Sequence, residues 1–266
     1  MSDRRKYTLQ DIIAHYDDDR RLFDKVVSLW VYYVTRPMSF PVTWVFLLIS
    51  LSSNAATLIS MVIGLTSCVM FTLGSRDTVI IGAILYNGFL VVDSVDGNIA
   101  RLLNTSSKKG EFFDALVGDL LGVLVLPCIA VGMVLQDQSI PSMVVSLLPV
   151  QPGYVFLIAS LIATLCHQIV ILQFQRRKVI LTTYGSKKPT DFGKSNSAFK
   201  IFIITIVRNL TGFPFLAPAV LVFALLDALW ILVFYMVLTN LILFVATLAY
   251  GFRTCFEEEP VHNLER

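Results

Sequence analysis

Long apolar runs without charge are the feature that most restricts how this chain can fold. The run from Ala55 to Gly74 contains no charged residue, and comparable runs recur as far as Tyr250. A helix needs roughly 20 apolar residues to cross a hydrocarbon core about 30 Å thick. Of the 266 residues, 56% are hydrophobic and 15% are charged, whereas soluble domains carry about 25% charged residues. The sequence therefore predicts an integral membrane protein.

Six runs are predicted to span the bilayer as helices, because lipid offers no other partner for the backbone polar groups. They are Ala55–Gly74, Thr78–Ala100, Glu111–Leu135, Gly153–Leu172, Leu210–Leu226 and Leu229–Tyr250. The predicted fold class is thus an all-α integral membrane protein, with a membrane domain over residues 39–252. The predicted flanking parts are a cytoplasmic N-terminal segment, residues 1–38, and a cytoplasmic tail, residues 253–266.

A shorter apolar run, Val42–Ile49, follows Pro41 and ends in a serine-rich stretch. Since it is too short to span the bilayer, it is predicted to be a cytoplasmic interfacial amphipathic helix with Trp44 at the level of the lipid headgroups. A separate membrane span is the alternative.

Basic residues give the expected topology. The connections at residues 75–77 and 136–152 hold one basic residue between them, Arg76. The connections after Leu103 and after Phe174 hold nine, namely Lys108, Lys109, Arg176, Arg177, Lys178, Lys187, Lys188, Lys194 and Lys200. By the positive-inside rule, the basic connections are cytoplasmic. The basic N-terminus joins them, and an even number of spans brings the C-terminus to the same side.

Carboxylates cluster within the spans, where ionisable groups are costly and usually functional. Asp93 and Asp96 are three residues apart and share a helix face, while Asp114 lies at a similar depth in the next span. Glu111 can share the face of Asp114. A divalent cation would relieve the repulsion among these acids, and oxygen ligands suit Mg²⁺, Mn²⁺ or Ca²⁺ rather than Zn²⁺.

Small residues and a cation accompany the acids. Gly97 and Ala100 leave room for a ligand to approach the backbone, and Arg101 can pair with a phosphate. Together these residues indicate a site for a metal-bound diphosphate. Helix packing, with the acids paired to Lys108 or Arg101, is the alternative.

The acids also carry a family resemblance. Asp93-x-x-Asp96-Gly97-x-x-Ala100-Arg101, followed after eight residues by Gly110-x-x-x-Asp114, resembles the signature of the CDP-alcohol phosphotransferase family. That signature reads D-x-x-D-G-x-x-A-R, about eight residues, G-x-x-x-D-x-x-x-D. Upstream, Asn54-x-x-Thr57 resembles the family's P-N-x-x-T, with Ser53 in place of the proline. The layout of an amphipathic helix before six spans is similar too, so the resemblance covers roughly residues 25–252.

The resemblance implies an enzyme that uses an acceptor hydroxyl to displace CMP from a CDP-linked donor. It implies that Asp93, Asp96 and Asp114 hold one or two Mg²⁺ or Mn²⁺ ions. The residues expected to line the CDP moiety are Asn54, Thr57, Gly97, Ala100 and Arg101. Gly110 is expected to permit close packing where the third span begins, and a homodimer is expected.

The chain departs from the signature at its last aspartate, where Gly118 stands. Asp119 does not repair the match, because it lies about 140° around the helix from Asp114, whereas position 118 lies about 40° away. In the family this last acid is a metal ligand and the expected general base. Glu111, and more weakly Asp119, are the alternative bases. The acceptor can instead carry its own anionic oxygen, or the protein can be a non-catalytic nucleotide- or lipid-binding protein.

The donor and acceptor are not specified by the motif. CDP-diacylglycerol with a polyol or sugar phosphate is the leading prediction, in phospholipid or related lipid or glycan biosynthesis. A CDP-aminoalcohol or CDP-polyol used on a lipid or glycan is the alternative. Candidate ligands for an anionic acceptor are Arg176, Lys187, Lys200 and Arg208; contact with lipid headgroups is their other interpretation. The net charge of +2 and the lack of a dense basic arm argue against nucleic-acid binding.

Overall fold

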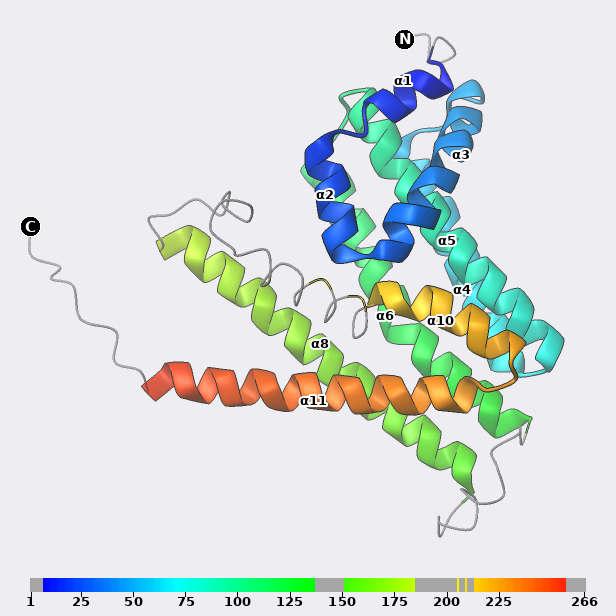
Figure 1. The fold of residues 1–266 in the computed structure, drawn as a ribbon, viewed down its shortest axis with the longest axis vertical. Helices are drawn as coiled ribbons and strands as arrows, with labels where there is room; N and C mark the ends of the chain where they lie inside the picture. The colour runs from blue at the N-terminus through cyan, green and yellow to red at the C-terminus, as the bar shows by residue number, and fades with distance from the viewer. Residues whose placement is uncertain (1–6, 137–150, 185–204, 206–208, 210–212, 257–266) are drawn as a thin grey trace, which may run out of the picture.

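The computed structural model describes residues 7–136, 151–184, 205, 209 and 213–256 (Figure 1). Its regular elements are helices, and no strand occurs within these ranges. Five helices are long and apolar enough to cross a membrane. The prediction of an all-α membrane protein is confirmed.

The five long helices are α4 (Ser53–Leu73), α5 (Arg76–Leu102), α6 (Lys108–Leu135), α8 (Pro152–Tyr184) and α11 (Leu229–Phe256). The first three begin at serine side chains, Ser52, Ser75 and Ser107, each of which accepts a hydrogen bond from a backbone N–H of the first turn. Helix α4 ends at Gly74, whose φ of 73° is the left-handed conformation that glycine adopts readily.

The sixth predicted span, Leu210–Leu226, corresponds to a shorter described helix. Helix α10 (Phe213–Leu225) has 13 residues, which gives a length of about 20 Å. Residues 210–212 lie outside the described residues. Length and composition thus support five spans, with α10 as an additional apolar helix.

Four short elements precede the spans: α1 (Leu9–Ala14), α2 (Asp18–Val27), the π-helix η2 (Val31–Thr35) and α3 (Arg36–Leu48). The predicted interfacial helix is the C-terminal part of α3, in which Trp44 is exposed. Helix α3 starts six residues earlier than the predicted run. Pro37 does not prevent this start, since it lies in the first turn, where proline is tolerated. It therefore crosses the predicted boundary between residues 38 and 39.

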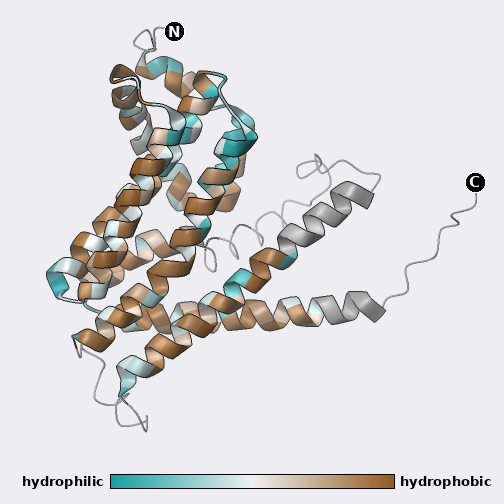
Figure 2. Cartoon of the chain, turned by 180° about the vertical axis from the view of Figure 1, so that it is seen from behind, coloured by the Kyte–Doolittle hydropathy of each residue, from teal (hydrophilic) through white to brown (hydrophobic). Residues whose placement is uncertain are grey.

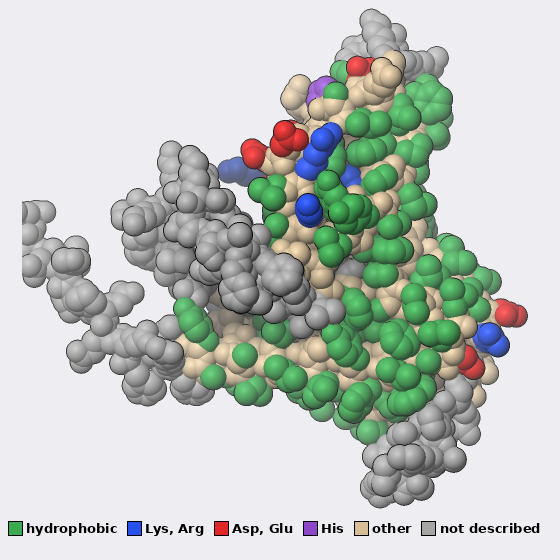
Figure 3. Space-filling model, viewed as in Figure 1, with side chains coloured by type: hydrophobic (Ala, Val, Ile, Leu, Met, Phe, Trp, Pro, Cys, Tyr) green, Lys and Arg blue, Asp and Glu red, His purple; other side chains and the backbone are tan. Residues whose placement is uncertain are grey.

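The long helices pack around α4 and α6. Helix α4 contacts both α5 and α6, α8 contacts α6 and α11, and α10 contacts α5. The crossing of α4 and α6 needs glycine at Gly132, because a Cβ there would lie 2.1 Å from the carbonyl oxygen of Phe71. Most residues of the long helices are apolar (Figure 2), and apolar side chains cover much of the face seen in Figure 3, as contact with lipid requires.

A second apolar cluster joins the N-terminal helices to one end of α5. Its buried members include Ile12 and Tyr16 from the N-terminal part, Phe40 from α3, and Val95 and Ile99 from α5. Charged side chains gather at this end of the molecule over α2 (Figure 3). The N-terminal segment thus packs directly on the stretch of α5 that carries the predicted site.

Candidate active site

Helix α5 presents two of the predicted acids to α4. Asp96 is 7% exposed, and its Oδ2 accepts a hydrogen bond of 2.6 Å from Thr57 Oγ1. Thr57 is itself buried and comes from α4. Asp93 lies one turn earlier on α5. Two of the predicted site residues, Thr57 and Asp96, therefore meet although they are 39 residues apart.

Helix α6 brings Asp114 to the same place. Its charge acts on the carboxyl groups of Asp93 and Asp96 on α5. Three carboxyl groups this close repel one another unless protons or cations lie between them. The acids that the sequence grouped by depth are thus neighbours in space.

The acid cluster, Asp93, Asp96 and Asp114, offers the type of ligand that a hard divalent cation prefers. Oδ1 of Asp93 is buried and finds no hydrogen-bond partner among the described residues, and buried polar atoms normally have one. Carboxylate oxygens are the ligands that Mg²⁺ and Mn²⁺ prefer. Within the described residues, no three acidic, histidine or cysteine side chains already converge as a complete metal-binding group.

Two of the predicted glycines lie at close approaches. A Cβ at Gly110 would lie 3.3 Å from Asn54 Oδ1 and 3.2 Å from Ser107 Oγ. The starts of α4 and α6 therefore come together here, as the sequence predicts. A Cβ at Gly97 would lie 3.0 Å from Arg101 Nη1. The guanidinium of Arg101, which lies one helical turn further along α5, thus occupies the space that Gly97 leaves. Gly97 itself is half-buried.

Sequence reasoning missed a group of polar residues behind this site. Arg36 of α3 donates from Nη1 to Asn98 Oδ1 at 3.1 Å, and Arg101 donates from Nη2 to the same oxygen at 2.9 Å. The charge of Arg36 also acts on Asp93, and that of Arg20 acts on Asp114. Asn98 occupies a variable position of the motif, and basic residues before a span were interpreted as topology signals. Neither pattern predicted that Arg36 is buried, with only 3% of it exposed.

The positions around the missing acid differ from the rest of the site. A Cβ at Gly118 would meet no described atom within 4 Å. Asp119 is exposed and its charge acts on His167 of α8, whose Nδ1 lies 3.0 Å from Asn240 Oδ1. Asp119 thus points toward another helix, as its angle around α6 indicates. Glu111 is exposed, and its charge acts on Asp114.

The predicted acceptor ligands lie outside the residues whose side chains the structure describes. They are Arg176, Lys187, Lys200 and Arg208. Their role stays a prediction.

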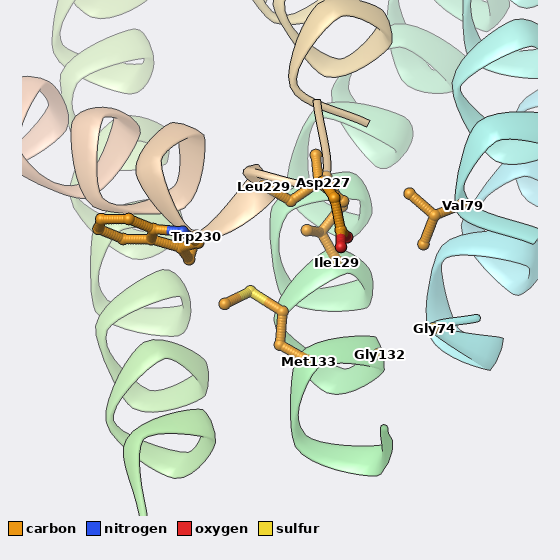
Figure 4. Close-up of a pocket in the computed structure, with 8 residues that line it drawn as sticks. All are labelled: Gly74, Val79, Ile129, Gly132, Met133, Asp227, Leu229 and Trp230. Atoms are coloured by element: carbon orange, nitrogen blue, oxygen red, sulfur yellow. The ribbon is translucent and has the colours of Figure 1, made fainter. Parts of the chain in front are cut away.

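A small pocket lies at the other end of the helices (Figure 4). It is lined by Gly74, Val79, Ile129, Gly132, Met133, Asp227, Leu229 and Trp230. The lining offers one carboxylate and no cation for a phosphate. This pocket is therefore not the candidate active site.

Comparison with known families decides what the acid cluster belongs to. A family model described as CDP-alcohol phosphatidyltransferase matches residues 50–211, more than half of the chain. The chain belongs to this family. The matched range contains Asn54, Thr57, the acids of α5 and Asp114, so the resemblance seen in the sequence is confirmed. A comparison with curated proteins gives no match.

Family membership fixes the class of reaction. CDP-alcohol phosphatidyltransferases transfer a phosphoalcohol group from a CDP-alcohol, and the family generally depends on divalent metal ions. The protein is thus a multi-pass membrane protein of a transferase family, and the acid cluster of α5 and α6 is its candidate active site.

Proposed function

We propose that the protein transfers the phosphatidyl group of CDP-diacylglycerol to an anionic acceptor alcohol and releases CMP. The observation that carries this proposal is that the charges of Asp93, Asp96 and Asp114 act on one another, and that of Asp96 on Arg101, at one end of the apolar helices. This arrangement suits a diphosphate whose lipid part stays in the bilayer.

The reaction forms one P–O bond and breaks another. The acceptor oxygen attacks the phosphorus that carries diacylglycerol, and the bond from this phosphorus to the CMP oxygen breaks. Bound Mg²⁺ or Mn²⁺, held by the three aspartates, would supply neutralisation of the charge that develops on the phosphates. Thr57 holds Asp96 in place through its hydrogen bond. Arg101 donates N–H groups to a phosphate oxygen.

The proton of the acceptor hydroxyl needs a base, and we assign this role to Glu111. Positions 111 and 118 are seven residues apart and lie on nearly the same face of α6, with Asp114 between them. An acceptor that extends from the open space beside Gly118 along α6 and past Asp114 would bring its hydroxyl to the carboxylate of Glu111, about 10 Å away along the helix axis. Removal of one positioned base typically costs 10²–10⁴-fold in rate.

The lipid donor follows from the position of the acids. They lie in the last third of α5 and near the start of α6, and the N-terminal helices pack on this stretch of α5. A CDP-linked lipid can reach this end of the spans with its acyl chains still in the membrane. The arginines at the same end, among them Arg20, Arg36 and Arg101, support a cytoplasmic position for this end by the positive-inside rule.

We also propose a homodimer that uses α11. Its exposed apolar side chains include Phe234, Leu238, Ile242 and Val245. Cysteine cross-linking along this face in membranes tests the assignment. Cross-links between two copies of the chain at these positions support an interface on α11. The absence of cross-links at all four positions would contradict it.

The test of the function is CMP release by the purified protein in lipid nanodiscs. CDP-diacylglycerol and a CDP-aminoalcohol are supplied in turn with Mg²⁺ or Mn²⁺ and with free polyols, polyol phosphates, sugar phosphates or diacylglycerol. Release from CDP-diacylglycerol with a phosphorylated acceptor is expected. Release from the CDP-aminoalcohol alone would replace the lipid donor by the small one. No release from any donor would indicate a non-catalytic binding protein.

A further inference from the structure

The N-terminal helices hold a fully buried ion pair that the reaction itself does not explain. Arg36 Nε of α3 donates to Asp24 Oδ2 of α2 at 2.8 Å, and both side chains are 3% exposed. Burying two charges removes their hydration, and an apolar pair of similar volume is often at least as stable. The pair is therefore a poor device for stability alone.

The carboxylate of Asp24 is held from several sides. Tyr16 donates its hydroxyl to Asp24 Oδ2 at 3.1 Å, and Arg20 Nε lies 3.2 Å from Oδ1. Burial, together with the negative charge of Asp24, raises the pKa of Tyr16 to about 12. The phenol thus stays a proton donor at neutral pH, and Asp24 stays fixed beneath Arg36.

Arg36 reaches from this carboxylate to the motif helix. Its Nη1 donates to Asn98 Oδ1 at 3.1 Å, while the amide nitrogen of Asn98 donates to Ser39 Oγ and to Thr43 Oγ1, each at 3.0 Å. The hydroxyl of Ser39 donates to the carbonyl oxygen of Arg36, and that of Thr43 donates to the carbonyl oxygen of Ser39. They can only accept from Asn98, so the amide has one orientation, with its oxygen toward the arginines.

That amide oxygen also holds Arg101. Nη2 of Arg101 donates to Asn98 Oδ1 at 2.9 Å, so two guanidinium groups converge on one oxygen. Two like charges this close repel each other, and Asp24 offsets the charge of Arg36. The charge of Arg101 is then the one left to face the acid cluster and the diphosphate of the donor.

We propose that Asp24 and Arg36 are positioning residues, which fix Asn98 and through it hold the Arg101 guanidinium at the donor diphosphate. The inference rests on the proposed function in that Arg101 binds this diphosphate. It makes the N-terminal helices a working part of the active site.

Three variants separate positioning from stability. Arg36→Lys keeps the ion pair with Asp24, but an ammonium lacks the planar fork that spans Asp24 and Asn98 together. Asp24→Asn combined with Arg36→Gln removes both charges, so no unpaired charge stays buried. Trp30→Phe is the matched control: Trp30 Nε1 donates to Asn87 Oδ1 at 3.1 Å, which also ties the N-terminal segment to α5 but makes no contact with Arg101.

The measurements are the Kd of CMP in the presence of Mg²⁺, the KM of the CDP donor, the KM of the acceptor and the melting temperature, all on the full chain in nanodiscs. For Arg36→Lys and for the double variant, we expect the CMP Kd and donor KM to rise about tenfold, which is the effect of losing roughly one charge-assisted hydrogen bond. The acceptor KM should change less than about twofold, within the range of surface-type changes. Trp30→Phe should leave both donor measurements unchanged.

The result that overturns the inference is wild-type donor KM and CMP affinity in both variants, with only the melting temperature lowered. Equal rises in donor and acceptor KM would also overturn it, because they would show a general distortion of the site. A wild-type protein that releases no CMP from any donor contradicts the proposed function instead. In that case the CMP Kd still reports on Arg101, and a wild-type protein that binds no CMP contradicts both.

Discussion

The two helices that carry the acids differ in how firmly they hold their polar groups. On α5, Asp96, Asn98 and Arg101 are each fixed by hydrogen bonds, to Thr57, to α3 or to one another. On α6, Glu111 and Asp119 are exposed, and Gly118 faces open space among the described residues. One half of the site is therefore preorganised and the other half is open.

The difference matches the two substrates of the reaction. The CDP part is common to the donors of the family, so a rigid half can be built around it, and fixed supporting contacts keep reacting groups in place. An open α6 half can admit an acceptor that brings negative charge where related enzymes place a carboxylate.

The largest expected effect comes from the rigid half. Asp96→Asn removes a charge from the acid cluster and should lower kcat/KM about 1,000-fold, as the loss of a strong electrostatic contribution at a reacting phosphate does. CMP release measures it. Asp77→Asn is the matched control, because Asp77 is exposed at the opposite end of the same helix. Equal losses of kcat/KM in Asp96→Asn and Asp77→Asn would show that the acid cluster has no special role in the reaction.

The next effect concerns the base on the open half. Glu111→Gln keeps the shape of the side chain but cannot take a proton, so kcat should fall about 100-fold. Single-turnover CMP release separates this loss from donor binding, which should stay unchanged. Unchanged turnover would dismiss Glu111 and favour an acceptor that arrives with an anionic oxygen.

A smaller effect is expected when the missing carboxylate is restored. Gly118→Asp should fold normally, because no described atom lies within 4 Å of the new Cβ. Repulsion of order 1 kcal/mol against an anionic acceptor should raise acceptor KM about fivefold and leave donor KM unchanged. Gly118→Asn, which has the same shape without the charge, should change acceptor KM less. A rise in activity would show instead that Gly118 merely marks the loss of the family's last aspartate and serves no specialised acceptor.

The smallest effect should be that of Asp119→Asn. Asp119 acts on His167 of α8 rather than on the acid cluster, so kcat/KM should change less than about twofold. CMP release with saturating donor and varied acceptor gives the comparison. A loss as large as that of Glu111→Gln would place the α6 base at position 119 and contradict the orientation seen in the structure.

The parts of the site that the sequence predicts are those with a local pattern. A spacing of three puts Asp93 and Asp96 on one helix face, and the family signature adds Thr57 and Asp114. The pairing of Arg36 with Asn98 joins residues 62 apart. Nothing in a basic residue before an apolar run distinguishes a buried guanidinium from one that contacts headgroups.

The fold shows the same division. Uncharged runs of about 20 residues predict the long helices well, because hydropathy over that length leaves few alternatives. The short helices are harder to predict from the sequence. The N-terminal part of α3 carries Arg36 and Ser39, whose burial comes from contacts with α5, and α10 is shorter than the span predicted for it.

The proposed function depends above all on CMP displacement by the acid cluster of α5 and α6. The most direct test is CMP formation from CDP-diacylglycerol by the purified chain in nanodiscs, with Mg²⁺, with a chelator and with Asp96→Asn. We expect CMP and a phosphatidylated product in equal amounts with Mg²⁺, and loss of both with the chelator and in the variant. Equal CMP formation by the wild-type chain and by Asp96→Asn would contradict it.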